Sequence, residues 1–247
     1  MIETFTALIC AHVLADFAFQ SNEMVAGKAR RHMPTLATHL AILLGLSTLL
    51  LLQLSGALLA ALILVGLSHF LIDIAKTFAP KSRALMAFIA DQGAHLLATA
   101  AIAASFPGLF ADAFWADQSW LPGLLALIAG AIVAIRAGGF AVGLLMARFD
   151  DSAPPEGLPQ GGRLIGQLER GVIFLLVLAG QPAAIGFLIA AKSILRFEAV
   201  SKNGANPKSE YVIIGTLASF GWALAGSYAT LALMSHLAPL GILPPAN

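Results

Sequence analysis

The sequence contains few charged residues and a single cysteine. Only 11% of its 247 residues are charged, whereas soluble domains carry about 25%. Cys10 lies in an apolar segment, so an internal disulfide is excluded and we interpret this side chain as a small buried one. The opening MIETFTALIC contains Glu3 and no Lys or Arg. It therefore lacks the basic start of a cleavable secretion signal, and we expect this segment to stay in the mature protein.

Basic tails and familiar catalytic motifs are also missing. The formal net charge is only +1, and no basic patch with interspersed aromatic residues occurs, so nucleic acid is excluded as a partner. The sequence contains no phosphate-binding P-loop, no nucleophile elbow and no metalloprotease helix motif. The substrate, the reaction and any protein partner therefore have no signature in the sequence.

Long apolar segments dominate what is present. Hydrophobic residues make up 59% of the chain, and about 20 consecutive apolar residues suffice for one helix to cross a bilayer. We predict an all-α, polytopic transmembrane bundle of about eight helices, with the lipid bilayer as its partner. The expected spans are 4–21, 34–52, 55–76, 84–105, 121–147, 164–180, 182–198 and 211–236. Gly180-Gln181-Pro182 favours a hairpin there, although one kinked helix over 164–198 would reduce the number to seven.

Basic residues lie in alternate connections between these spans. Lys and Arg follow the first, third, fifth and seventh spans, whereas the other connections and both termini carry none. Cytoplasmic loops of membrane proteins are enriched in Lys and Arg. We therefore expect a multi-pass protein of the cytoplasmic membrane with both termini outside. The acidic, Pro/Gly-rich segment 149–162 is typical of a linker, and it separates an N-terminal part, 1–148, from a C-terminal part, 163–247.

Three of the predicted spans carry a His and an Asp four residues apart. The pairs are His12 with Asp16, His69 with Asp73, and Asp91 with His95. Residues with this spacing project from one face of a helix. The order is reversed in the third pair, whose span runs in the opposite direction. The pattern therefore predicts a layer of three histidines, with the three aspartates nearer the cytoplasm. His39, near the start of the second span, is placed to join either layer.

This pattern has three interpretations. Imidazole and carboxylate groups together suit a divalent zinc, iron or manganese ion. The same groups also suit a proton relay, and polar side chains in membrane helices often only bond neighbouring helices. A charged group within the bilayer is costly, which favours function over packing alone. The candidate metal ligands are His12, Asp16, His39, His69, Asp73, Asp91 and His95. The candidate catalytic residues are Asp16, Asp73, Asp91, Gln20 and Gln92.

A second group of candidates is cationic. Lys192 and Arg196 lie one turn apart near the expected inner end of the seventh span, and Arg170 lies within the sixth. Snorkelling of long side chains to lipid headgroups explains such positions in many membrane proteins. The functional alternative is an anion-binding site beside the His and Asp layers, formed by Arg170, Lys192, Arg196 and Lys76.

The chain resembles a bacterial membrane family known as domain of unknown function 3307. The resemblance rests on HVLADFAFQ, HFLIDIAK and DQGAH in the N-terminal half, and on GRLIGQLER, AIGFLIAAKSILRF and SEYVIIGTLASF in the C-terminal half. It implies a polytopic protein of the bacterial inner membrane and carries over no catalytic role. The residues themselves lead us to expect a metal-dependent hydrolase acting on a lipid-like or phosphate-bearing substrate. The alternatives are a proton- or cation-coupled transporter and a structural membrane protein.

Overall fold

The computed structural model describes residues 1–149, 160–201 and 207–240, with side chains outside 193–209. Within these residues the regular secondary structure is helical and contains no strand, which confirms the all-α prediction. Backbone contacts divide the chain into two units. Unit 1 comprises Met1–Ile132 and Leu233–Leu240, and unit 2 comprises Val133–Ala232. Most of the expected linker, 149–162, lies outside the described residues.

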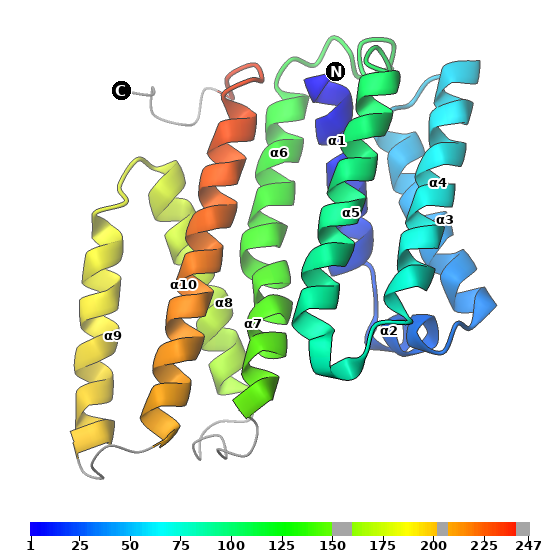
Figure 1. Ribbon diagram of the computed structural model, residues 1–247. Helices are drawn as coiled ribbons and strands as arrows, with labels where there is room; N and C mark the ends of the chain where they lie inside the picture. Colours follow the sequence, from blue (N-terminus) through cyan, green and yellow to red (C-terminus); the bar gives the residue numbers. More distant parts are fainter. Residues whose placement is uncertain (150–159, 202–206, 241–247) are drawn as a thin grey trace. The chain divides into compact units, whose positions relative to one another are not determined.

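Unit 1 contains the helices of the chain up to Ile132 (Figure 1). Its elements are α1 (Ile2–Val13), the π-helix η1 (Leu14–Ala18), α2 (Asn22–Ala29), α3 (Met33–Leu50), α4 (Gly56–Lys76), the 3₁₀ turn η2 (Lys81–Arg83), α5 (Ala84–Ser105) and α6 (Leu121–Ile132). Side-chain caps begin two of them. Ser21 Oγ accepts the Met24 N–H at the start of α2, and Ser55 Oγ accepts the Leu58 N–H at the start of α4.

Unit 2 contains the remaining helices of the described residues and their connections. Its elements are the π-helix η3 (Val133–Ala137), α7 (Gly138–Met146), the 3₁₀ turn η4 (Ala147–Phe149), α8 (Gly161–Leu178), α9 (Ala184–Ser201) and most of α10 (Pro207–Met234). Between α8 and α9 the chain turns at Gly180, whose φ of 69° is a left-handed value that favours glycine. Residues 164–198 therefore form two helices, and the single kinked helix is wrong.

Several of these helices are long and apolar enough to cross a membrane. Five meet that description by length and composition: Met33–Leu50, Gly56–Lys76, Lys81–Ser105, Leu121–Phe149 and Glu210–Met234. A sixth is added if Ile2–Ala18 and Asn22–Ala29, which are bent by 96° at their junction, count as one broken span. These helices fit a polytopic membrane protein. In the described part of the chain, α8 and α9 form helices near the positions expected for the sixth and seventh spans.

Helix α1 is the central helix of unit 1, in contact with α3, α5 and α6. Its small side chains let the neighbouring backbones approach closely. Ala7, Cys10 and Ala11 are fully buried, as are the hydroxyl-bearing Thr4 and Thr6. The burial of Cys10 agrees with its interpretation as a small buried side chain. Because α1 is enclosed on several sides, polar groups on its surface must find partners within the protein.

The loop between α5 and α6 ties together one end of unit 1. Phe110 is only 2% exposed, and its N–H donates to Thr4 Oγ1 in α1. Trp115 Nε1 donates to the carbonyl of Leu49 at the end of α3. Phe110 thus belongs to the hydrophobic core of unit 1, while Phe114 and Trp120 in the same loop are exposed.

The short helix α2 lies at the opposite end of unit 1 (Figure 1). A Cβ added at Gly27 would lie 2.5 Å from Thr35 Oγ1, so only glycine allows α2 and α3 to approach this closely. Arg31, with φ of 57°, donates from Nε to Thr77 Oγ1 beyond the end of α4. These contacts hold α2 across the ends of its neighbours and thereby position Lys28.

Candidate metal centre

Three helices of unit 1 each contribute one His and one Asp to a common buried cluster. His12 Nε2 lies 3.9 Å from Asp16 Oδ2 across the junction of α1 and η1. On α4, His69 Nε2 is 3.5 Å from Asp73 Oδ2, and on α5, His95 Nε2 is 3.6 Å from Asp91 Oδ1. All six side chains are buried. The four-residue spacing accounts for each pair, because such residues share one face of a helix.

Asp16 lies in the middle of a π-helix rather than an α-helix. The segment Leu14–Ala18 is the π-helix η1, and its wide turn closes when the Phe19 N–H donates to the Leu14 carbonyl. A π-turn bonds residues five apart, so it rotates the following side chains relative to a regular helix, and such turns are frequent at functional sites. The wide turn therefore sets the direction of the Asp16 carboxylate toward α3, α4 and α5.

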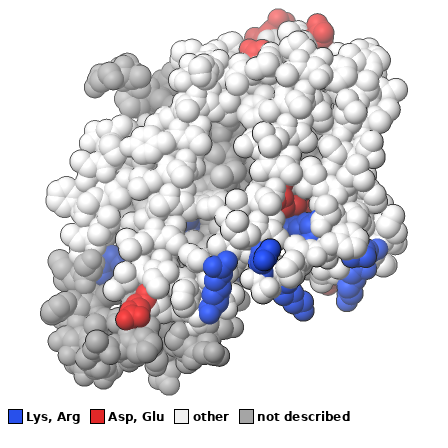
Figure 2. Space-filling model, viewed as in Figure 1, with Lys and Arg blue, Asp and Glu red and all other residues white. Residues whose placement is uncertain are grey.

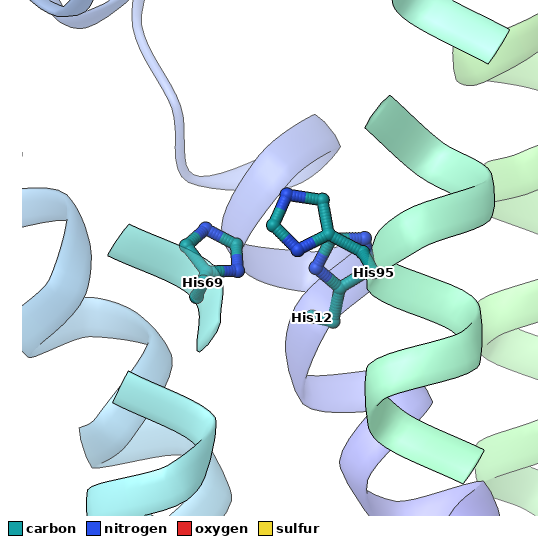
Figure 3. A group of neighbouring side chains, drawn as sticks. All are labelled: His12, His69 and His95. Carbon is teal, nitrogen blue, oxygen red and sulfur yellow. The ribbon is translucent and has the colours of Figure 1, made fainter. Parts of the chain in front are cut away.

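The three pair histidines come together as a group. The ring centroids of His69 and His95 are 4.2 Å apart, those of His12 and His95 are 4.6 Å apart, and those of His12 and His69 are 5.4 Å apart. Figure 3 shows the three rings side by side, each from a different helix. One ligand nitrogen from each lies within 4.8 Å of the others, which is compact enough for a shared metal ion.

His39 from α3 joins the cluster as the most deeply buried histidine, at 1% exposure. Its Nε2 is 2.9 Å from His69 Nε2, so one of these nitrogens carries the proton and the other accepts it. The same His39 nitrogen lies 3.1 Å from Asp16 Oδ1. Asp16 Oδ1 has no hydrogen-bond partner among the described residues. The short separation from His39 is therefore a contact without hydrogen-bond geometry. His39 is thus in contact with both the His and the Asp groups.

Two lysines lie against the carboxylates. Lys28 Nζ is 2.6 Å from Asp73 Oδ2, and it also donates to Gln20 Oε1 at 2.8 Å. Lys76 Nζ is 2.7 Å from Asp91 Oδ2. With neutral histidines, three carboxylates and two ammonium groups leave one negative charge uncompensated. An uncompensated charge in a buried site is unfavourable, so the cluster favours a further cation.

Gln92 connects the carboxylates of two helices. Its Nε2 donates to Asp16 Oδ2 at 3.1 Å and to Asp91 Oδ2 at 3.0 Å. Its Oε1 lies 3.2 Å from His12 Nε2. Because an amide oxygen only accepts, His12 carries its proton on Nε2 and leaves Nδ1 with a free lone pair. Gln92 thus fixes the tautomer of His12 and the separation of two acids.

Several polar atoms of the cluster have no hydrogen-bond partner among the described residues. They are Asp16 Oδ1, Asp91 Oδ1, His95 Nε2 and His39 Nδ1. Leaving a buried polar group unsatisfied costs about 1–3 kcal/mol. All four belong to residues of the sets whose His and Asp ligand atoms lie within 4.8 Å of one another. The orphaned atoms and the chemistry of the donors therefore both fit a divalent metal.

A small cavity adjoins the three pair histidines. Its volume is about 10 Å³, and its lining includes His12, His69 and His95 together with the hydroxyl-bearing Ser68 and Thr99. A cavity of roughly 10–15 Å³ holds one water molecule when polar partners are present. The imidazole and hydroxyl groups supply such partners, so this cavity suits one water.

Cationic side chains surround the end of unit 1 nearest the cluster. Figure 2 shows Lys and Arg gathered there, where α2 and the α4–α5 connection lie. The exposed cations at this end are Arg30, Arg31, Lys76, Lys81 and Arg83. Lys28 and Lys76 differ in access to solvent, because their side chains are 14% and 39% exposed. This end therefore favours the approach of anionic groups.

The remaining candidate cations belong to unit 2, where Arg170 and Lys192 have partners of their own. Arg170, which is 3% exposed, donates from Nε to the Ile135 carbonyl of η3 and from Nη1 to Ser219 Oγ of α10. Lys192 Nζ is 2.6 Å from Glu169 Oε2. The side chain of Arg196 lies outside the described residues. Arg170 thus holds three elements of unit 2 together.

Sequence reasoning overlooked Lys28, Ser68 and Thr99. Lys28 reaches Asp73 only because α2 turns by 96° away from the preceding helix, and nothing in its spacing signals that bend. Ser68 and Thr99 precede His69 by one residue and follow His95 by four. The second spacing is a signal that was available, since it places Thr99 on the face of His95.

Comparison with protein families matches residues 4–120 to the family described as "Protein of unknown function (DUF3307)". The matched segment contains the three N-terminal motifs and every His and Asp of the cluster. The C-terminal motifs lie beyond it. No curated protein and no solved structure matches the chain.

Proposed function

We propose that this chain, which belongs through residues 4–120 to the DUF3307 family, is a metal-dependent hydrolase embedded in the bacterial inner membrane. The observation that carries the proposal is the buried cluster of four histidines and three aspartates. Within it, three sets of ligand atoms each lie inside 4.8 Å, and Asp16, Asp91 and His95 in these sets each carry a buried atom without a hydrogen-bond partner in the described chain. Structural packing alone would satisfy such atoms.

The donors favour a zinc, iron or manganese ion. Mixed imidazole and carboxylate ligation suits these divalent metals, whereas copper(I) prefers sulfur. A bound ion of this kind lowers the pKa of a coordinated water and so supplies hydroxide at neutral pH. The water-sized cavity beside His12, His69 and His95 is the proposed place for that water. Gln92, which donates to Asp16 and Asp91, keeps both carboxylates oriented.

The proposed substrate carries a phosphate ester and approaches from the cationic end of unit 1. In the reaction the hydroxide oxygen forms a new bond to phosphorus, the ester P–O bond breaks, and the leaving alkoxide takes a proton from water. Lys76 is the proposed cation for the phosphate, because its ammonium contacts Asp91 of the cluster while its side chain is 39% exposed. By the distribution of positive charge this end faces the cytoplasm, and both termini lie outside.

Metal content tests the proposal first. Detergent-purified protein is expected to retain at least one equivalent of zinc, iron or manganese by mass spectrometry, and His69→Ala is expected to lose at least one. The matched control is His236→Ala, since His236 is exposed and outside the cluster. A well-folded protein that binds none of these metals at any concentration would overturn the proposal.

Activity is the second test. Phosphate release from an aryl phosphate and from phosphatidic acid in mixed micelles is expected to require the bound metal and to fall about 100-fold in Asp91→Asn, because loss even of the groups that orient metal ligands typically costs about 10- to 100-fold. Full activity after complete metal removal would contradict the hydrolase mechanism.

A second candidate is a proton-coupled transporter, which one contact favours specifically. His39 Nε2 and His69 Nε2 share a hydrogen bond at 2.9 Å, and such a pair passes a proton readily. Solute flux into liposomes that responds to a pH gradient, without turnover of any phosphate ester, would favour this candidate over the hydrolase.

A further inference from the structure

The buried cluster contains more ligands than one metal ion uses. Four imidazoles and three carboxylates lie together, all buried, whereas a catalytic ion in a protein takes about three protein ligands and keeps one position open. The three possible ligand sets are His12–His69–His95, Asp16–His39–His69 and Asp16–Asp91–His95. The surplus raises the question of which sets can be filled together.

The residues that the sets share decide which of them can be filled together. An imidazole nitrogen has one lone pair and binds one ion, so two sets that share a histidine exclude each other. The first set shares His69 with the second and His95 with the third. The second and third sets share only Asp16. A carboxylate has two oxygens, so it can bind two ions at once, and these two sets are compatible.

The two oxygens of Asp16 face different partners. Oδ1 lies 3.1 Å from His39 Nε2 and 3.6 Å from His69 Nε2. Oδ2 instead accepts from Gln92 Nε2, which also donates to Asp91 Oδ2. Asp16 therefore presents one oxygen to the histidines of α3 and α4 and the other toward α5. This is the arrangement that a bridging carboxylate requires.

The unsatisfied atoms are divided between the same two sets. Asp16 Oδ1 belongs with His39 and His69, while Asp91 Oδ1 and His95 Nε2, 3.6 Å apart, belong to the other set. Each set thus contains at least one buried atom that lacks a hydrogen-bond partner in the described residues. A single ion would coordinate the unsatisfied atoms of only one of the two sets.

We propose that the cluster holds two divalent cations bridged by the Asp16 carboxylate. The first ion is bound by Asp16, His39 and His69, and the second by Asp16, Asp91 and His95. The inference rests on the proposed metal-dependent function and specifies its metal centre. Two-metal sites with ions about 3.5–4 Å apart stabilise both the attacking and the leaving oxygen in phosphoryl transfer.

Charge balance supports two ions and a phosphate-bearing substrate. Two divalent cations and one hydroxide neutralise the three buried carboxylates. The ammonium groups of Lys28 and Lys76, at 2.6 and 2.7 Å from Asp73 and Asp91, then leave two positive charges. A dianionic phosphate ester carries the complementary charge.

The role of His12 distinguishes the two-ion arrangement from a single ion bound by three histidines. In the two-ion arrangement His12 is not a ligand, because it belongs to neither of the two compatible sets, and its Nε2–H donates to Gln92. A single ion bound by His12, His69 and His95 would depend on it and would leave His39 unused. The two arrangements therefore predict opposite effects for substitutions at His12 and His39.

The experiment uses Mn²⁺ as the probe on the full chain in detergent. Wild type is expected to bind two equivalents by mass spectrometry and to give the low-temperature paramagnetic resonance spectrum of two magnetically coupled Mn²⁺ ions. His39→Gln should retain one uncoupled ion, and His12→Gln should retain two coupled ions. Circular dichroism and gel filtration check that each variant is folded.

The alternative outcomes are distinct. One equivalent in wild type, with the signal of an isolated ion that is lost in His12→Gln, would overturn the two-ion centre and leave the metal-dependent function standing. No bound Mn²⁺, zinc or iron in folded wild type would overturn both.

Discussion

At the scale of single residues, Gln92 is the side chain on which the carboxylates depend most. Its amide nitrogen donates to Asp16 and Asp91 at once, and its oxygen accepts from His12. Its loss would leave two buried carboxylates facing each other without a shared donor.

Gln92→Leu is expected to destabilise the metal-free protein by about 1–3 kcal/mol, the cost of unsatisfied buried polar groups. The measurement is the free energy of unfolding in detergent, with metal removed by chelator. Gln118→Leu is the control, because Gln118 is exposed and surface changes usually stay within about 0.5 kcal/mol. Equal stability of the two variants would show that Gln92 does not hold the carboxylates.

In the proposed metal centre, Lys76 would compete with a metal ion for Asp91. Its ammonium lies 2.7 Å from Asp91 Oδ2, and its side chain is 39% exposed, so solvent weakens the pair. Removing the charge frees the carboxylate and also removes repulsion between two cations. Lys76→Gln is therefore expected to tighten Mn²⁺ binding about threefold to tenfold, measured as Kd by calorimetric titration.

The control for Lys76 is Lys81→Gln, which removes an exposed cation at the same end of unit 1. That substitution is expected to change the Kd for Mn²⁺ by less than about twofold at physiological salt, because exposed charges are screened beyond about 8 Å. Weaker binding in Lys76→Gln would mean that the lysine assists metal binding instead.

At the scale of helices, the pattern of apolar residues did not reveal the π-helix η1 or the short helix α2. The other long helices begin and end near the expected spans, as α4 does at Gly56–Lys76 against 55–76. A single extra residue in a helical turn leaves the average hydrophobicity unchanged. The polar α2, Asn22–Ala29, has no apolar stripe.

The wide turn of η1 offers a direct test of how the fold aims Asp16. Deleting Ala18, an exposed residue at the end of this turn, would allow a regular α-helical turn and rotate the Asp16 carboxylate away from His39. The deletion is expected to lower Mn²⁺ stoichiometry by at least one equivalent while helical content by circular dichroism stays unchanged.

Ala18→Ser keeps the number of residues in the turn and serves as the control, with full metal content expected. A deletion variant that binds metal as wild type does would show that the π-helix is not what positions Asp16.

At the scale of the whole molecule, the fold class can be predicted from the sequence more completely than the arrangement of the site. Composition and apolar segments suffice for an all-α, membrane-spanning architecture, because the bilayer imposes the length of each helix. The four-residue spacing places each His and Asp on one helix face, but it does not specify which helices meet. The contact between His39 and His69, and the reach of Lys28 to Asp73, depend on tertiary packing. A single sequence contains no such information.

Orientation in the membrane is predicted from the distribution of positive charge and can be measured with single cysteines. Cys10 is fully buried and should react slowly, so the natural chain serves as background. Ser82→Cys lies in the exposed, basic α4–α5 connection, and Ser119→Cys lies in the exposed α5–α6 loop at the other end of unit 1. If the basic end faces the cytoplasm, a membrane-impermeant maleimide added to intact spheroplasts should label Ser119→Cys and leave Ser82→Cys unmodified until the cells are lysed. Because the proposed phosphate-ester substrates would approach the cluster from the basic end, the reverse labelling pattern would place the candidate centre on the outer side and exclude cytoplasmic esters as substrates.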